Sequence, residues 1–252
     1  MSQATRVAFV TGAGAGIGRA IAQALAQADH AVVAGDVNLS AAEETAATIR
    51  ATGAEAVASL VDVTNVDSID SAFNEVDKRW GRLDVLVNNA GIARVAHLLD
   101  MSIDDFRAVF DVNVMGTFLC TQRAATLMRK NRWGRIVNTA SISAFRASAG
   151  RAAYGPSKAA VVSLTKQTAI EMSRDGITAN AVAPGPIETE FTLKHHPDAM
   201  RRAYERSVPL GRYGLPEEIA AAVCFLASEK AGYINGCVLD VDGGFLAAGV
   251  PD

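Results

Sequence analysis

Three residues in the segment SISAFRASAGRAAYGPSK have side chains that could move a proton to or from an alcohol oxygen: Ser141, Tyr154 and Lys158. Tyr154 and Lys158 are spaced i and i+4, so in a helix they lie on one face. A free phenol has a pKa of about 10, and lowering it to about 7 takes roughly 4 kcal/mol. An ammonium about 4 Å away, at an effective dielectric of about 20, supplies an energy of that size. The pattern predicts Tyr154 as a general acid or base near neutral pH, with Ser141 donating to a developing oxyanion.

A polar residue, Asn113, stands between valines in FDVNVMGTF, an otherwise apolar helical segment. A buried asparagine must be hydrogen-bonded. Asn113 therefore either ties its helix to a neighbouring strand or takes part in the catalytic site, and the residue alone favours neither.

A glycine-rich turn lies in VAFVTGAGAGIGRAIAQAL, between an expected strand and a helix that starts near Ile17. Its glycines allow a tight turn and a close approach to a pyrophosphate, and the helix N-terminus directs its free N–H groups at the anion. The spacing is Gly12-x-x-x-Gly16-x-Gly18 rather than G-x-G-x-x-G, and no Gly-Lys-Ser/Thr follows. The turn predicts phosphate binding, with a flexible turn as the alternative.

An aspartate, Asp36, ends the next apolar run in VVAGDVNLS. A dinucleotide-binding fold needs an acid at the tip of its second strand, where it accepts hydrogen bonds from the adenosine ribose hydroxyls. Asp36 has the right position after the glycine turn, and it predicts NAD as the cofactor. A turn cap is the alternative for Asp36 alone.

The elements that must position these residues alternate along the chain. Strands are expected at Val7–Val10, Ala31–Ala34, Ala56–Val61, Leu83–Val87, Arg135–Asn138, Thr178–Val182 and Val238–Val241. Helices are expected at Ile17–Ala28, Ala41–Thr52, Ser68–Trp80, Ile103–Lys130, Ala152–Ser173 and Pro216–Ser228. Apolar strands separated by helices predict a parallel sheet covered on both faces, in one α/β domain over residues 1–252. Residues 1–140 form the cofactor half and 141–252 the catalytic half, and the irregular stretch 184–215 supplies a lid at about 187–215.

The composition limits the partners. Half of the residues are hydrophobic, enough to bury a sizeable core. The net charge is −3, which argues against nucleic acid or an anionic membrane as a partner. There is no signal peptide or spanning segment in the printed sequence, and its three cysteines are far apart, so a reducing cytoplasm is expected. The adjacent His195 and His196 are expected to be solvated, and no metal site is predicted.

The chain resembles the classical short-chain dehydrogenases/reductases over essentially its whole length. The matching motifs, in order, are Thr11-Gly12-x-x-x-Gly16-x-Gly18, Asp62-Val63, Asn88-Asn89-Ala90-Gly91, Asn113, Ser141, Tyr154-x-x-x-Lys158, Pro184-Gly185 with Ile187 and Thr189, and Asp242-Gly243-Gly244. Each motif is common alone, but all of them in this order are specific.

The resemblance implies a Rossmann-type doubly wound sheet of seven parallel strands, order 3-2-1-4-5-6-7, and a homotetramer built partly on the helices at 103–130 and 152–173. It implies that Tyr154 is the acid/base, that Lys158 binds the nicotinamide ribose and lowers the phenol pKa, and that Asn113 holds a water. Substrate contacts are expected from Ser141, Ser143 and Tyr154. Cofactor contacts are expected from Gly12, Gly16, Ile17, Gly18, Asp36, Asp62, Val63, Asn89, Gly91, Tyr154, Lys158, Pro184, Gly185, Ile187 and Thr189.

The expected reaction is hydride transfer between NAD(H) and a secondary alcohol/ketone pair, the substrate being a small alcohol, a polyol or a hydroxyacyl compound. The alternative is an NADPH-dependent 3-oxoacyl-thioester reductase, whose acyl carrier would dock on Arg129, Lys130, Arg132, Arg135 and Arg174. A solvated helix end is the simpler interpretation of these cations. A non-catalytic NAD-binding regulator is a third reading, disfavoured because both Tyr154 and Lys158 are present. Further residues that could line the pocket are Arg94, His97, Phe145, Arg146 and Arg151.

Overall fold

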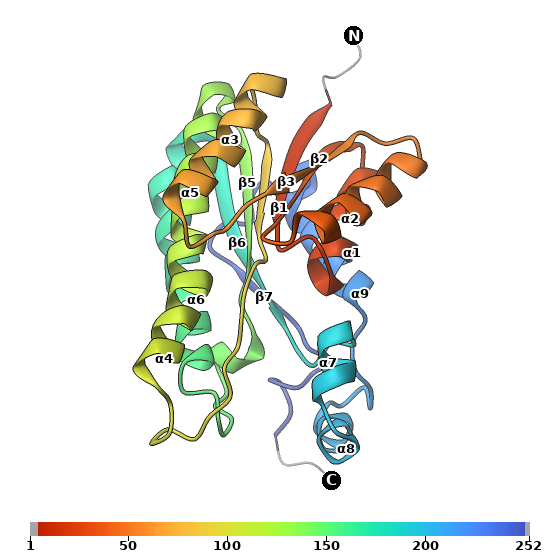
Figure 1. Cartoon of the computed structure of the whole chain (residues 1–252), viewed down its shortest axis with the longest axis vertical. Coiled ribbons are helices and arrows are strands. Elements are labelled where there is room, and N and C mark those ends of the chain that lie inside the picture. The colour runs from red at the N-terminus through yellow and green to blue at the C-terminus, as the bar shows by residue number, and fades with distance from the viewer. Residues whose placement is uncertain (1–4, 250–252) are drawn as a thin grey trace.

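The computed structural model describes residues 5–249, without the side chains of Phe191 and His195. Within that range seven strands form one parallel sheet in the order β3-β2-β1-β4-β5-β6-β7 (Figure 1). The strands are β1 Arg6–Thr11, β2 His30–Asp36, β3 Ala56–Leu60, β4 Val85–Asn88, β5 Gly134–Thr139, β6 Ile177–Pro184 and β7 Val238–Val241. The predicted doubly wound sheet is confirmed.

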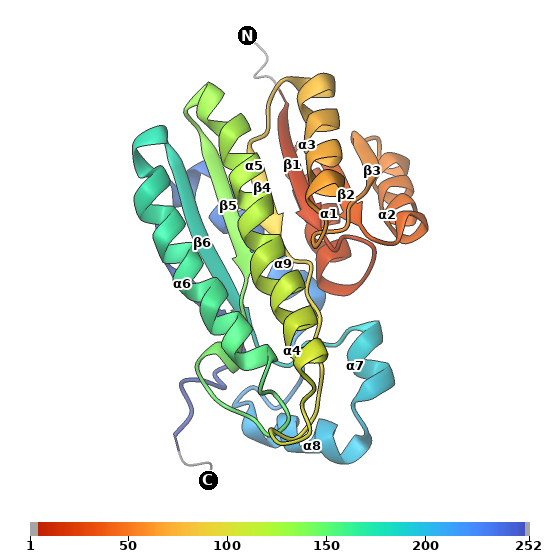
Figure 2. The same ribbon diagram turned by 60° about the vertical axis from the view of Figure 1, so that its left-hand side comes forward.

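Helices cover both faces of the sheet (Figures 1 and 2). The helices are α1 Gly16–Gln27, α2 Leu39–Ala51, α3 Val66–Trp80, α4 Ile103–Phe110, α5 Gly116–Asn131, α6 Tyr154–Met172, α7 Glu190–His195, α8 Asp198–Ser207 and α9 Pro216–Ala227. Helices α1, α2 and α9 pack on one face, and α3, α5 and α6 pack on the other. Strand β1 contributes to both cores: Ala8 and Val10 belong to the first, Val7 and Phe9 to the second. This is why the strands are apolar throughout rather than alternating.

The carboxyl ends of the central strands meet at one edge of the sheet. Thr11, Asp36, Asn88, Thr139 and Pro184 are the last residues of β1, β2, β4, β5 and β6. In open α/β sheets, ligands bind outside this edge, where the strand order reverses. Here the order reverses between β1 and β4, so the fold places the expected cofactor site at that crevice.

Two predictions of local structure were wrong. The expected single helix over 103–130 is interrupted by a π-helical turn, Asp111–Met115, which contains Asn113. The stretch 184–215, expected to be irregular, contains α7 and α8. A parallel bridge between Ile187 and Gly214 joins the two ends of this stretch. Among the described residues, no helix is long and apolar enough to cross a bilayer.

Candidate active site

The glycine turn after β1 is held in shape by its neighbours. Gly12 has a φ of +65°, a conformation that favours glycine. The side chain of Asn89 donates to the carbonyls of Thr11 and Gly12, each at 3.1 Å. A Cβ on Gly18 would lie 2.0 Å from the Gly12 carbonyl oxygen, so only glycine lets α1 pack this closely against the turn. Because α1 begins at Gly16, shortly after β1 ends at Thr11, its N-terminus lies at the carboxyl edge of the sheet, as a phosphate-binding turn requires.

The carboxylate of Asp36 is tied to the same turn. Its Oδ2 accepts from the Gly14 N–H at 2.9 Å, and its Oδ1 accepts from the Asn38 N–H at 2.9 Å. A Cβ on Gly14 would lie 2.8 Å from Oδ2, so glycine is needed for this contact. Thr45 donates to the Ala13 carbonyl at 2.9 Å and holds the turn from the α2 side, a role that sequence reasoning missed. Asp36 is thus both a structural partner of the turn and a half-exposed acceptor.

Arg19 is the cation next to the turn. It donates to the Gly14 carbonyl at 2.5 Å. Two carboxylates flank it, from Glu44 at 3.9 Å and from Glu190 at 3.8 Å. Its charge is therefore shared with acids of α2 and α7.

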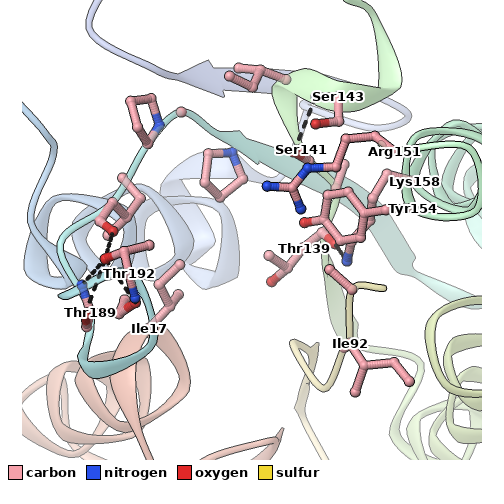
Figure 3. A pocket seen from close by; sticks show the side chains of 18 of the residues that line it. Ile17, Ile92, Thr139, Ser141, Ser143, Arg151, Tyr154, Lys158, Thr189 and Thr192 are labelled. Atoms are coloured by element: carbon pink, nitrogen blue, oxygen red, sulfur yellow. Dashed lines mark hydrogen bonds between the residues drawn. The ribbon is translucent and has the colours of Figure 1, made fainter. Parts of the chain in front are cut away.

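The three residues with proton-transfer chemistry come together beyond β5 (Figure 3). Ser141 follows the strand in extended conformation, and Tyr154 and Lys158 lie one turn apart at the start of α6. The ammonium of Lys158 is buried, donates to the Thr139 carbonyl at 2.7 Å and lies 5.7 Å from the centroid of the Tyr154 ring. The predicted pairing of Tyr154 with Lys158 on one helix face is present in the structure.

The pKa values of this pair differ from the expectation. Burial raises the pKa of Tyr154 above its ordinary value, while a hydrogen bond with Ser141 and the charge of Arg151 act in the opposite direction. Burial also lowers the pKa of Lys158 to about 8. The protein environment alone therefore does not make the phenol acidic, because the ammonium is directed at the Thr139 carbonyl and burial outweighs the nearby charge.

Asn113 is satisfied by hydrogen bonds within the protein. Its Oδ1 accepts from the Ile92 N–H at 2.9 Å, and its Nδ2 donates to the Ile92 carbonyl and to Ser157 Oγ, both at 3.0 Å. It therefore ties the chain after β4 to α6. A Cβ on Gly91 would lie 3.2 Å from Asn113 Oδ1 and 3.4 Å from Lys158 Nζ. Asn113 thus adjoins Lys158, and its π-helical turn is of a kind often found at functional sites.

A pocket of about 420 Å³ opens in front of Tyr154. The predicted site residues that line it are Ile17, Asn89, Gly91, Ser141, Ser143, Tyr154, Lys158, Pro184, Gly185, Ile187 and Thr189. The predicted site residues outside its lining are Gly12, Gly16, Gly18, Asp36, Asp62, Val63 and Asn113. Asp62 accepts from the N–H of Thr64 at 2.9 Å, and Val63 belongs to the core beside Gly116.

The segment 184–215 adds four pocket residues that sequence reasoning missed: Pro186, Thr192, His196 and Tyr204. His196 shares a hydrogen bond with the Tyr213 hydroxyl at 3.0 Å and stacks on Tyr204. The expectation of a solvated histidine pair is therefore wrong for His196. The side chain of His195 is not among the parts of the chain that the structure describes. For Tyr204, the sequence did offer a signal, since Met200 and Tyr204 are spaced i and i+4 and so lie on one face of α8.

Of the further candidates, Arg94 and Arg151 also line the catalytic pocket. His97 and Phe145 line a neighbouring pocket, and Arg146 lines another. The cations considered for carrier docking are largely engaged. Arg129 pairs with Asp175 at 2.9 Å and Lys130 with Asp77 at 2.7 Å. The Arg132 side chain donates to the Arg174 carbonyl, and the Arg135 guanidinium lies over the Trp133 ring.

Comparisons with known proteins agree with this geometry. A family model described as enoyl-(acyl carrier protein) reductase matches residues 12–246. A 3-oxoacyl-[acyl-carrier-protein] reductase from Synechocystis sp. is 42% identical, over 96% of this chain and 97% of that protein. One from Aquifex aeolicus is also 42% identical, over 96% of this chain and 97% of that protein.

Among solved structures, a gluconate 5-dehydrogenase from Burkholderia cenocepacia in complex with NADP and tartrate superimposes with a TM-score of 0.93. It is 37% identical and covers 97% of this chain and 96% of that chain. The fold and the matched residues define a nicotinamide-dependent α/β oxidoreductase. The chain belongs to the short-chain dehydrogenase/reductase family.

Proposed function

We propose that this enzyme interconverts the alcohol and ketone of a 3-hydroxyacyl/3-oxoacyl substrate, with NAD(H) as cofactor and Tyr154 as the general acid/base. The observation that carries the proposal is the convergence of Ser141, Tyr154 and Lys158 in one pocket beside the glycine turn. A non-catalytic regulator would have no need for this combination of a proton donor, an ammonium and a hydroxyl.

The described residues fit a nicotinamide dinucleotide. The glycines at 12, 14, 16 and 18 allow the pyrophosphate to approach the α1 N-terminus closely, and the Asp36 carboxylate retains acceptor capacity for the adenosine ribose. Asp62 and Val63 would contact adenine, and Lys158 the nicotinamide ribose. Asn89, Ile187 and Thr189 would meet the nicotinamide. When bound, the cofactor supplies or accepts the hydride, and its oxidised ring adds positive charge near the phenol.

Within the pocket, residues of the protein transfer the proton to or from the substrate oxygen. In the reductive direction the Tyr154 hydroxyl donates its proton to the ketone oxygen, and Ser141 donates a hydrogen bond to the same oxygen as charge develops on it. In the oxidative direction the Tyr154 phenolate accepts the alcohol proton. Lys158 stabilises that phenolate by its charge, and Asn113 positions the chain around Lys158 through Ile92 and Ser157.

Asp36 and Arg19 support NAD over NADP. A 2′-phosphate would meet the Asp36 carboxylate, and Arg19 offsets it poorly because Glu44 and Glu190 flank its guanidinium. The comparisons do not support this preference, since the Burkholderia structure holds NADP. NAD preference is therefore a proposal that rests on the residues of this chain.

The relatives narrow the substrate. The names of these relatives support the alternative substrate, a 3-oxoacyl thioester, better than a small alcohol or a polyol. The name of the Burkholderia gluconate 5-dehydrogenase points to a hydroxy acid as the substrate of that enzyme. These substrates share an acyl group on the carbon chain that carries the carbinol, which is why a hydroxyacyl compound is proposed here. The paired state of Arg129 and Lys130 does not favour a docked carrier protein.

The test is a panel of four-carbon substrates assayed with NAD(H) and NADP(H) by the absorbance of the reduced nicotinamide. The panel holds the 3-hydroxy acid, its methyl ester, its thioester and a plain secondary alcohol. We expect the acyl compounds to exceed the plain alcohol in kcat/KM at least tenfold. A plain alcohol that matches them, or no turnover of any member, would refute the proposed substrate class.

Assembly into a homotetramer is also a proposal. Large apolar side chains are exposed on the π-helical turn, α5 and α6, including Met115, Phe118 and Ile170. Ile170 is 75% exposed, which is unusual for an isoleucine in a helix that otherwise packs on the sheet. These helices are the ones on which the family resemblance places part of the tetramer.

The segment 187–215 is expected to act as a substrate lid. Helix α8 has no buried residues, while Thr192, His196 and Tyr204 of this segment line the pocket. Trypsin should therefore cut apo enzyme first at Arg202 or Arg206, and cofactor with substrate should slow this cleavage at least fivefold. Cleavage at Lys78 in α3, far from the pocket, is the internal control. Equal rates with and without ligands would exclude ligand-coupled closure.

A further inference from the structure

The charges that line the catalytic pocket are all positive. Its lining includes Arg94, Arg151 and Lys158, and no aspartate or glutamate. Arg94 is paired with Asp105 at 3.2 Å, and Lys158 donates to the Thr139 carbonyl. Among the described residues, Arg151 has no carboxylate within ion-pair distance. The positive charge of Arg151 is therefore available to pair with a negatively charged group of a ligand.

Arg151 is directed into the pocket beside the acid/base residue. Its guanidinium carbon lies 5.4 Å from the centroid of the Tyr154 ring, and Figure 3 shows the group extending past that ring into the open space. The same charge opposes the rise in the pKa of Tyr154 caused by burial. A ligand atom bound to Arg151 would thus lie close to a carbinol at the Tyr154 hydroxyl.

Arg151 also marks the junction with a second pocket, of about 650 Å³. The two pockets share Arg151, His196 and Tyr204. The second pocket again has no acidic lining residue, and its other cation, Arg146, lies over the Phe245 ring. Its walls include Val95, Met200 and Phe245, which are apolar and screen charge weakly. The positive charge at the junction is consequently uncompensated on both sides.

A half-buried guanidinium without an acid is costly to maintain, since charged side chains inside proteins are normally paired. Its planar fork matches a carboxylate through two parallel N–H···O bonds, which a neutral ester or thioester oxygen accepts more weakly. The junction therefore favours a ligand that brings its own carboxylate.

We propose that Arg151 binds the carboxylate of the substrate, so that the preferred substrate is a free 3-hydroxy acid or 3-oxo acid rather than a thioester. This inference rests on the proposed function and specifies its substrate class. In the oxidative direction the carbinol carbon loses hydride to NAD⁺, the hydroxyl loses its proton to Tyr154, and the carboxylate remains unchanged. Arg151 holds that carboxylate while the carbinol lies between Ser141 and Tyr154.

The experiment compares kcat/KM for a four-carbon 3-hydroxy acid, its methyl ester and its thioester in the wild type, in Arg151→Gln and in Arg151→Lys. The wild type should prefer the acid to the ester by at least 30-fold, and Arg151→Gln should reduce that preference to threefold or less while still oxidising the ester. Arg151→Lys should keep part of the preference, because it retains charge without the fork. Arg94→Gln is the matched control, since it removes a paired cation from the same pocket and should change the preference less than threefold.

Ester oxidation by Arg151→Gln shows that this variant is folded and binds cofactor. A wild type that oxidises the ester or the thioester as well as the acid overturns the inference and leaves the proposed function standing. A wild type that oxidises none of the three overturns the proposed function itself.

Discussion

Replacing Tyr154 by phenylalanine is expected to reduce kcat by at least a hundredfold while leaving the Kd for NAD nearly unchanged. Only the transferable proton is lost, and general acid/base catalysis contributes typically about 10²–10⁴-fold. The phenylalanine ring would still fill the half-buried place beside Lys158, so the pocket keeps its shape. The measurement pairs steady-state rates with NAD binding by calorimetry.

Lys158→Ala is the comparison for this prediction. It should weaken both turnover and NAD binding, because the ammonium is proposed to stabilise the Tyr154 phenolate and to bind the nicotinamide ribose. The rate of alcohol oxidation in the wild type should rise with pH as the Tyr154 phenolate forms, since burial holds the pKa of that phenol up. If Tyr154→Phe retains more than about a tenth of the wild-type rate, Tyr154 is not the acid/base residue.

The second large effect concerns the cofactor. Wild-type enzyme is expected to prefer NAD to NADP by at least tenfold in kcat/KM, equivalent to about 1.4 kcal/mol. Like charges about 4 Å apart at an effective dielectric of about 20 repel by roughly 4 kcal/mol before salt screening, so a tenfold preference is a lower bound. The repulsion arises between Asp36 and a 2′-phosphate.

Two variants separate the charge of Asp36 from its structural contacts. Asp36→Ala should remove most of the preference, but it also leaves the Gly14 N–H without its acceptor. Asp36→Asn keeps an oxygen for that N–H and removes only the charge, so it should relax the preference with less loss of NAD affinity. A wild type that prefers NADP would contradict this reading and support the NADPH-dependent thioester reductase instead.

The sheet could be predicted because its strands are buried on both faces and stand out as short apolar runs between helices. The π-helical turn around Asn113 could not be predicted in this way, since one extra residue in a helical turn barely disturbs the apolar periodicity over 103–130. Helices α7 and α8 were missed because charge, histidine and proline dominate their segment. The capping box of Thr189 and Thr192, which begins α7, uses a threonine where the usual pattern has Glu or Gln.

In the candidate site, too, some features could be predicted from the sequence and others depend on tertiary packing. The grouping of Tyr154 with Lys158 follows from their spacing in the chain, so the sequence alone predicts it. The pKa of Tyr154 cannot be predicted in this way, because it depends on burial in the folded chain and on groups from distant elements, such as Tyr204 of α8, which raises it electrostatically. Arg94 and Arg151 look equivalent in the sequence, and only the packing of α4 shows that Asp105 pairs with Arg94 and not with Arg151.

The strand order has a consequence for how this enzyme can diversify. Asp36 ends β2, whereas Arg151 precedes α6, which packs on the far side of the crossover, with β1, β4 and β5 in between. Residues that are well separated and share no partners contribute independently to the free energy. The residues proposed here to select the electron carrier and the substrate therefore lie on separate parts of one fold, and on this proposal selection can change either preference without changing the other.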